Sequence, residues 1–238
     1  MIEMVNKILF FQYKRIWFAH TLPRRSPFTF ISLRQYRGQA PEHYHEKKFM
    51  TLISDLTQSE GELLSLIAKN TKYEIKRAAR ENCCADVVSL DEFAPFFNEF
   101  APSKNLHPLT KKNIETLKPY SIATAVKAVN TPLLAMHLYL IDKSISRVRL
   151  LYSATVNRKE TDLDLNFVGR ANRFLHWDDM LRFKSMNIKN YDWGGIAGTD
   201  DPATSGIDDF KKAFGGYEVH ENHYEDKRLY LIKKILKR

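Results

Sequence analysis

Three apolar runs, joined by short connectors and followed by one long helical segment, limit the fold of this chain more than any other feature. The runs cover residues 120–130, 133–142 and 146–156. Their connectors, Thr131-Pro132 and Asp142-Lys143, are short enough for antiparallel hairpins. The next segment, 164–186, is predicted to form one long helix. The order predicts a largely antiparallel sheet interrupted by helices.

The flanking segments extend this pattern. Further strands are predicted at residues 8–19, 28–36, 50–56, 85–90, 190–193, 217–224 and 228–235, the last two as a hairpin over 225–227. Further helices are predicted at 60–82, 91–100, 110–118 and 207–214. The fold class is therefore α+β, a mixed and mostly antiparallel sheet flanked by helices, with an N-terminal β/α extension. We expect residues 1–84 to form that extension and 85–238 the main domain, together one compact unit.

Local signals mark the ends of several elements. Asp91 and Thr110 are predicted N-caps, and Gly215-Gly216 is a predicted C-cap. The pair Asn70-Thr71 is expected to break or bend the helix over 60–82. The basic turn over 23–27 is expected to separate the first two strands.

Composition limits the partners and the compartment. Lys and Arg number 37 against 28 Asp and Glu, a formal charge of +9, which favours phosphate-bearing partners such as tRNA, a nucleotide cofactor or an anionic membrane; a generally basic surface is the alternative. The only cysteines, Cys83 and Cys84, are adjacent and frame no zinc site, so a cytoplasmic protein is expected. His43 and His45 lack further ligands, and no metal is expected. The apolar stretch 8–18 is interrupted by charges, and a bilayer requires roughly 20 apolar residues, so no transmembrane segment is expected.

The start of the long helix is the strongest candidate for a binding site. The segment from Asn166 to Ala171 follows a strand and opens the helix, where unpaired N–H groups and the helix dipole favour a phosphate. Gly169 permits close approach of the backbone, and Arg170 and Arg173 add charge-assisted contacts. A plain helix start is the alternative.

This segment and the order of elements resemble the GNAT acyltransferase superfamily. Its pyrophosphate loop reads Gln/Arg-x-x-Gly-x-Gly/Ala, and Asn166, Gly169 and Ala171 occupy the three defining positions, with Asn departing at the first. The resemblance implies a donor site that includes the strand preceding the helix. The implied donor-binding residues are Tyr152, Ser153, Ala154, Asn166, Val168, Gly169, Arg170, Ala171, Asn172 and Arg173.

Two further stretches resemble the Fem-type branch of that superfamily, which attaches amino acids to peptidoglycan precursors from aminoacyl-tRNA. They are residues 191–216, with Tyr-Asp-Trp-Gly-Gly-Ile at their start, and residues 69–78. Fem-type ligases usually carry two such domains and several add a helical arm, whereas this chain has room for one domain and an extension. A single-domain relative that uses acetyl-CoA or another acyl-CoA is therefore the favoured hypothesis, and aminoacyl-tRNA is the alternative donor.

The resemblance implies direct transfer to an amine, with backbone N–H groups of the strand over 150–156 facing the acyl carbonyl. An amine must lose a proton, so a base is needed. Asp192 is one candidate, with capping of the Gly-rich turn as its alternative role. His137 is another, with a half-buried structural role as its alternative. Tyr191 and Tyr224 are candidate proton donors to a leaving thiolate. His176 is expected to be a core or rim residue.

One helix face carries Lys69, Lys72, Lys76, Arg77 and Arg80. It is expected either to hold phosphates of tRNA or another anionic substrate, or to be a solvated surface. The leading hypothesis is an N-acyltransferase acting on an amino sugar or a cell-envelope precursor. The alternatives are a Fem-like aminoacyltransferase and a non-catalytic binding domain of the same fold.

Overall fold

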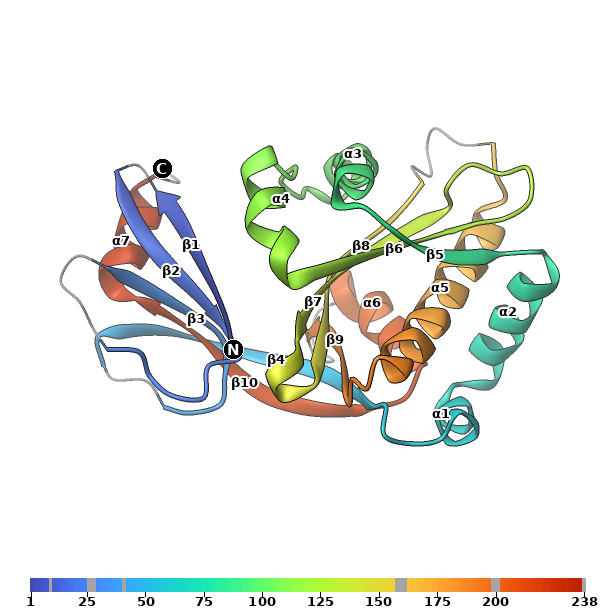
Figure 1. Cartoon of the computed structure of the whole chain (residues 1–238), viewed down its shortest axis with the longest axis horizontal. Helices are drawn as coiled ribbons and strands as arrows, with labels where there is room; N and C mark the ends of the chain where they lie inside the picture. The colour runs from blue at the N-terminus through green and yellow to red at the C-terminus, as the bar shows by residue number, and fades with distance from the viewer. Residues whose placement is uncertain (9, 25–28, 40–41, 157–161, 198–201, 237–238) are drawn as a thin grey trace. The chain divides into compact units, whose positions relative to one another are not determined.

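The computed structural model describes residues 1–8, 10–24, 29–39, 42–156, 162–197 and 202–236, and confirms the predicted α+β class (Figure 1). Residues 25–27 of the predicted basic turn and the last two residues lie outside this described part. By their contacts the residues group into two compact units. The first comprises Met1–Thr51, Gly195–Ser205 and Glu218–Arg238, and the second comprises Leu52–Gly194 and Gly206–Tyr217. The domain division expected between residues 84 and 85 stays a prediction.

The second unit is built on the three predicted hairpin strands. These are β6 (Ser121–Lys127), β7 (Ala135–Asp142) and β8 (Arg147–Thr155), which pair antiparallel in that order. At one side β5 (Cys84–Val88) pairs antiparallel with β6, and at the other β9 (Asn190–Ile196) pairs parallel with β8. The predicted antiparallel pairing and the mixed, mostly antiparallel sheet are therefore confirmed, although the connectors cover residues 128–134 and 143–146 and are longer than predicted.

Helices cover both faces of this sheet (Figure 1). One face carries α5 (Leu165–Ser185), on which α2 (Lys69–Arg80) packs; the other carries α3 (Leu90–Phe100). The shared core of α2, α5, β6 and β7 consists of small and aliphatic side chains. Its buried members include Ala78, Val126, Leu134, Val168, Ala171 and Leu175. The remaining helical elements of this unit are α1 (Glu60–Leu66), α4 (Lys111–Leu117), most of α6 (Pro202–Lys212) and the single turns η1 (Ala101–Lys104), η2 (Lys118–Tyr120) and η3 (Lys143–Ile145).

The first unit contains β1 (Ile2–Ile8), β2 (Phe11–Trp17), β3 (Phe30–Tyr36), most of β10 (Tyr217–Asp226) and α7 (Lys227–Leu236). The order in the sheet is β1-β2-β3-β10, with β2 and β3 parallel. β4 (Tyr44–Asp55) contributes Tyr44 to Thr51 to this unit and its last four residues to the other. Tyr36, Tyr44 and Tyr224 share one buried cluster here. No described helix is both long and apolar enough to cross a membrane.

Several sequence predictions of local structure are wrong. The predicted strand over 228–235 is the helix α7, because Asp226 accepts a hydrogen bond from the Arg228 N–H at the helix start and Leu229 and Ile232 face inward at helical spacing. The cap of α3 is Ser89, which forms a capping box with Glu92, and not Asp91.

The boundaries of three other elements also differ from the prediction. The helix over 60–82 is interrupted at residues 67–68, where Ile67 is extended, ahead of the predicted bend. The strand β9 continues to Ile196 into the expected loop, and α6 begins at Pro202 before the predicted start of its helix. Residues 198–201 of the predicted Gly-rich loop lie outside the described part.

Gly216 joins α6 to β10 at a position that only glycine suits. Its φ is +111°, and a Cβ built there lies 2.7 Å from the backbone oxygen of Ile53. A backbone oxygen is not free to move aside as a side chain would be, so the preference for glycine is steric as well as conformational.

We expect Gly216→Ala to lower the free energy of unfolding by about 1–3 kcal/mol, because the new methyl group clashes and the backbone is strained. Gly61→Ala is the matched control, since a Cβ at this helical position meets no atom within 4 Å. The control should be neutral or stabilising by up to about 1 kcal/mol. Chemical denaturation measures both, and equal stability of the two variants would contradict this account of the turn.

Candidate active site

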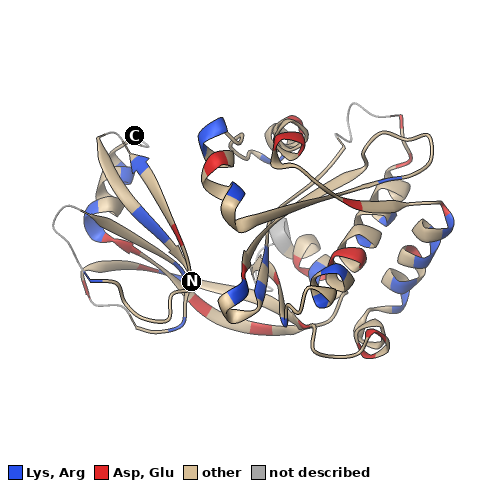
Figure 2. Ribbon diagram, in the orientation of Figure 1, with Lys and Arg blue, Asp and Glu red and all other residues tan. Residues whose placement is uncertain are grey.

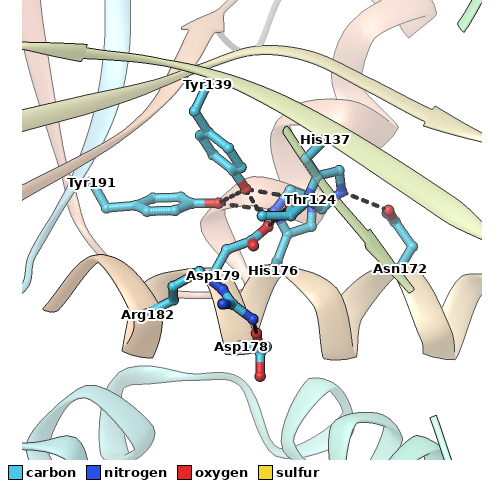
Figure 3. A network of polar contacts seen from close by, with 9 residues as sticks. All are labelled: Thr124, His137, Tyr139, Asn172, His176, Asp178, Asp179, Arg182 and Tyr191. Atoms are coloured by element: carbon cyan, nitrogen blue, oxygen red, sulfur yellow. Dashed lines mark hydrogen bonds and ion pairs between the residues drawn. The ribbon is translucent and has the colours of Figure 1, made fainter. Parts of the chain in front are cut away.

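A chain of hydrogen bonds runs from a fully buried carboxylate to a histidine beside a cavity (Figure 3). Oδ2 of Asp179 on α5 accepts from the hydroxyl of Tyr139 on β7 at 2.6 Å. The hydroxyl of Tyr139 lies 2.7 Å from that of Tyr191 on β9, which lies 3.1 Å from Nδ1 of His176 on α5. Asp179, Tyr139 and Tyr191 have no exposed surface, and His176 is buried as well.

The directions of these hydrogen bonds follow from the number of protons available. The single hydroxyl proton of Tyr139 is donated to Asp179, so Tyr191 must donate its own proton to the oxygen of Tyr139. The oxygen of Tyr191 is then an acceptor for His176, and the proton of His176 lies on Nδ1. Nε2 of His176 keeps its lone pair and has no hydrogen-bond partner among the described residues.

The surroundings keep His176 neutral. Burial lowers the pKa of His176 well below its usual range, and the positive charges near it, above all at His137, lower it further. Burial and the Asp179 carboxylate raise the pKa values of Tyr139 and Tyr191, so both tyrosines stay protonated. The chain therefore presents an unprotonated imidazole nitrogen near neutral pH, as a general base requires.

A second branch from Asp179 passes through His137. Oδ2 of Asp179 lies 2.8 Å from Nδ1 of His137, and Oδ1 of Asn172 lies 3.0 Å from Nε2. Both ring nitrogens of His137 thus face oxygen atoms of neighbouring side chains. The ring of His137 stacks on that of His176 at 3.9 Å between centroids. Thr124 donates to the same carboxylate oxygen at 3.1 Å.

Both branches end at a cavity of about 530 Å³ within the second unit. His176, Asn172, Gly169 and Arg173 line it from α5. β8 and the residue after it contribute Leu150, Ser153, Thr155 and Val156 to the lining, and β9 contributes Trp193. Helix α6 contributes Gly206, Ile207, Phe210 and Lys211. Phe100, Ser103 and Lys104 line the remaining side. The lining combines aromatic and aliphatic walls with a few polar groups, as in sites for small organic substrates.

The cavity lies where two parallel strands separate. β8 and β9 pair over Arg147–Arg149 and Asn190–Asp192, and the described residues show no pairing between them beyond that point. The next residues, Leu150 and Trp193, face the cavity. Residues of both strands therefore border the cavity, together with His176.

The predicted catalytic residues lie in different surroundings. Tyr191 and His137 belong to the two branches from Asp179, and neither is among the residues that line the cavity. Asp192 is fully buried, where Oδ2 accepts from Arg147 at 2.6 Å and Oδ1 accepts from the Gly194 N–H at 2.8 Å. Tyr224 belongs to the first unit, where its hydroxyl lies 3.1 Å from the Glu46 carboxylate. The catalytic role of each stays a prediction.

Only some of the predicted donor-binding residues line the cavity. Gly169, Asn172, Arg173 and Ser153 line the cavity, whereas Val168, Ala171 and Ala154 are buried core residues. The ring of Tyr152 packs against Phe97 of α3, and Asn166 is exposed. Donor binding by this set stays a prediction.

Carboxylates occupy much of the predicted phosphate site. Asp164 caps α5 and accepts from the Asn166 N–H at 2.9 Å. Arg170 donates twice to Glu81, each time at 2.9 Å, and Arg173 pairs with Glu74 at 2.7 Å. Asp164 places a negative charge at the helix start, where an incoming phosphate would meet repulsion.

Lys211 on α6 is a second titratable group that the sequence did not indicate. It is half-buried beside the cavity, and burial together with the positive charge of Arg149 lowers its pKa to about 8. Burial raises the pKa of the Cys83 thiol to about 11, which leaves it a poor nucleophile. No group of three or more His, Cys, Asp or Glu that could hold a metal ion occurs among the described residues.

One signal for His176 was present in the sequence. Asn172, His176 and Asp179 recur at spacings of four and three, so they form a polar stripe on one face of the helix. A polar stripe on the face that packs against a sheet indicates a buried polar network and not a simple core.

No protein-family model and no curated protein sequence matches the chain. Solved structures do. FemX matches over 97% of this chain and 85% of its own, with a TM-score of 0.68 and 12% identity. This likeness shows that the chain has the fold of FemX. The C-terminal domain of a protein described as a lysylphosphatidylglycerol synthetase from Agrobacterium fabrum matches over 88% of this chain and 71% of its own, with a TM-score of 0.57 and 11% identity. L-PGS from Bacillus licheniformis matches over 87% of this chain and 71% of its own, with a TM-score of 0.54 and 11% identity.

The buried pair of Asp192 and Arg147 permits a test of a structural role for Asp192. We expect Asp192→Ala to lower the free energy of unfolding by about 3–5 kcal/mol, because it leaves the Arg147 guanidinium buried without its carboxylate. The double variant Asp192→Leu/Arg147→Met should recover most of that loss. Asp91→Ala, which breaks the exposed 3.7 Å pair with Lys118, should change stability by about 1 kcal/mol or less. A stable Asp192→Ala variant would contradict a structural role.

Proposed function

We propose that this protein is an N-acyltransferase that moves an acyl group from an acyl thioester to an amine in the cavity of the second unit. The observation that carries the proposal is the chain from Asp179 to His176, which ends in an unprotonated nitrogen beside a cavity at the separation of β8 and β9. The fold shared with FemX supports group transfer. Acetyl-CoA is the donor that we favour, with an amino sugar or a related cell-envelope precursor as acceptor.

In the proposed reaction the acceptor nitrogen attacks the acyl carbon, a C–N bond forms, and the C–S bond of the thioester breaks. The proton released by the amine passes to Nε2 of His176. The positive charge that then develops on the imidazole is stabilised through Nδ1–H by the two tyrosines and the carboxylate behind it. The thiolate that leaves takes a proton from the ammonium of Lys211, whose pKa of about 8 is close to that of a thiol.

This assignment predicts a bell-shaped pH profile for kcat at saturating acceptor. Because the pKa of His176 lies below 6.5, the base stays active as the pH falls through 6.5, and activity is lost only at lower pH. On the alkaline side, activity should fall as the pH rises through about 8, where Lys211 loses its proton. Release of free thiol from acetyl-CoA with a panel of amines measures the profile.

Variants test whether His176 and Lys211 are the groups that set the two limbs of this pH profile. His176→Gln should lower kcat by about 10²-fold or more, and Lys211→Met should abolish the alkaline limb. His107→Gln, at an exposed histidine, is the matched control and should leave the rate unchanged. If calorimetry detects no binding of any acyl-CoA to the purified protein, the proposal of a thioester donor fails.

A specific observation also favours aminoacyl-tRNA as an alternative donor. Lys69, Lys76 and Arg80 are exposed on α2, where Figure 2 shows positive charge along the helix. In this version the same base acts, and the bond that breaks is the ester of the aminoacyl group. Binding of charged tRNA that weakens steeply with salt, with no binding of acetyl-CoA, would establish this donor in place of the thioester.

A further inference from the structure

The first unit exposes a group of large apolar side chains that no catalytic role explains. We call them the tip patch; its members are Val5, Phe10, Phe11, Leu231, Ile235 and Leu236. Phe10, next to the turn between β1 and β2, is 97% exposed, and Ile235 on α7 is 70% exposed. Large apolar groups exposed together indicate an interaction surface more often than isolated ones do.

The two parts of the tip patch belong to one end of the unit. Ile8, at the end of β1, and Ile232, on α7, both pack against the buried cluster of Tyr13, Phe30 and Leu229. The side chain of Lys233 lies over the Tyr13 ring, 4.6 Å from its centroid. The hairpin turn and the last turns of α7 are therefore neighbours, as Figure 1 also shows.

The chain segments that carry the tip patch contain basic residues and no carboxylates. Residues 5–8, 10–14 and 227–236 contain no Asp or Glu, and Figure 2 shows Lys and Arg on the β1–β2 hairpin and on α7. Lys14, Arg228 and Lys233 pair with carboxylates elsewhere in the unit. Lys7, Lys227 and Lys234 are exposed and form no ion pair with any described residue.

On α7 the exposed positions Lys227, Leu231, Lys234 and Ile235 follow helical spacing, so apolar and cationic side chains alternate along one face. Leu229 and Ile232 face inward and hold the helix on the unit. A helix with lysines beside exposed Leu and Ile suits the boundary between lipid head groups and acyl chains, where the apolar groups insert and the ammonium groups meet phosphates.

We propose that the tip patch docks the protein on an anionic lipid bilayer, with Phe10, Leu231 and Ile235 inserted and Lys7, Lys227 and Lys234 at the head groups. A protein partner fits less well, because the cores of protein interfaces are depleted in lysine. A second copy also fits less well, since a two-fold contact would place the same lysines against each other. This proposal is independent of the acyltransferase proposal.

Co-sedimentation of the full chain with large unilamellar vesicles tests it. We expect binding to phosphatidylcholine vesicles that contain phosphatidylglycerol, weakened by added salt, and little binding to phosphatidylcholine alone. The variant Phe10→Ser/Ile235→Ser should lower the partition coefficient by on the order of tenfold. The variant Lys7→Gln/Lys227→Gln/Lys234→Gln should lower it by on the order of tenfold or more.

Matched controls lie on α2. Tyr73→Ser removes a side chain that is also exposed, and Lys69→Gln/Lys76→Gln/Arg80→Gln removes the same charge from the other unit. Both controls should bind vesicles as the natural chain does, and circular dichroism verifies that all variants fold. Equal losses for the α2 and tip-patch variants, no vesicle binding, or dimers in light scattering that the Ile235→Ser change abolishes would each overturn the proposal.

Discussion

The carboxylate of Asp179 is the interaction on which the proposed site depends. It is fully buried, and a buried charge is costly unless hydrogen bonds satisfy it. Its Oδ2 receives them from Thr124, His137 and Tyr139, one residue on β6 and two on β7. Because Tyr139 donates its proton to this oxygen, Tyr191 donates to Tyr139 and His176 donates to Tyr191. The carboxylate therefore determines the hydrogen-bond directions along the chain and the position of the proton on His176. The same interactions hold α5 on the sheet.

α5 therefore has two functions in this account. Val168, Ala171 and Leu175 pack in the core shared with α2, β6 and β7, which fixes the position of the helix. Asn172 and His176 lie on the same helix and line the cavity. A base carried by a packed helix is held more rigidly than one on a loop, as an ordered proton transfer requires. The fold thus supplies the stability of the site as well as its location.

The sequence predicted the fold well where the determinants were local. The hairpins around β7 need only short connectors and apolar runs, and the Thr110 cap of α4 lies three residues from its partner. The dense apolar residues of α7 fit the period of a strand as well as that of a helix, and the contact of Asp226 with the Arg228 N–H favours the helix. The sequence alone predicts only a core or rim position for His176, because its hydrogen bond is made with Tyr191, fifteen residues away and on another element. The phosphate motif around Gly169 identified the helix that borders the cavity, but a local pattern does not show that Glu81 engages Arg170.

The central claim is that His176 is a neutral base with its proton on Nδ1. Nitrogen-15 NMR of the histidine rings, titrated with acid and assigned with the His176→Gln variant, tests it most directly. We predict the Nδ1–H tautomer at neutral pH and protonation with a midpoint below 6.5, the ordinary value for histidine. An Nε2–H tautomer, or an imidazolium at neutral pH, would contradict the claim.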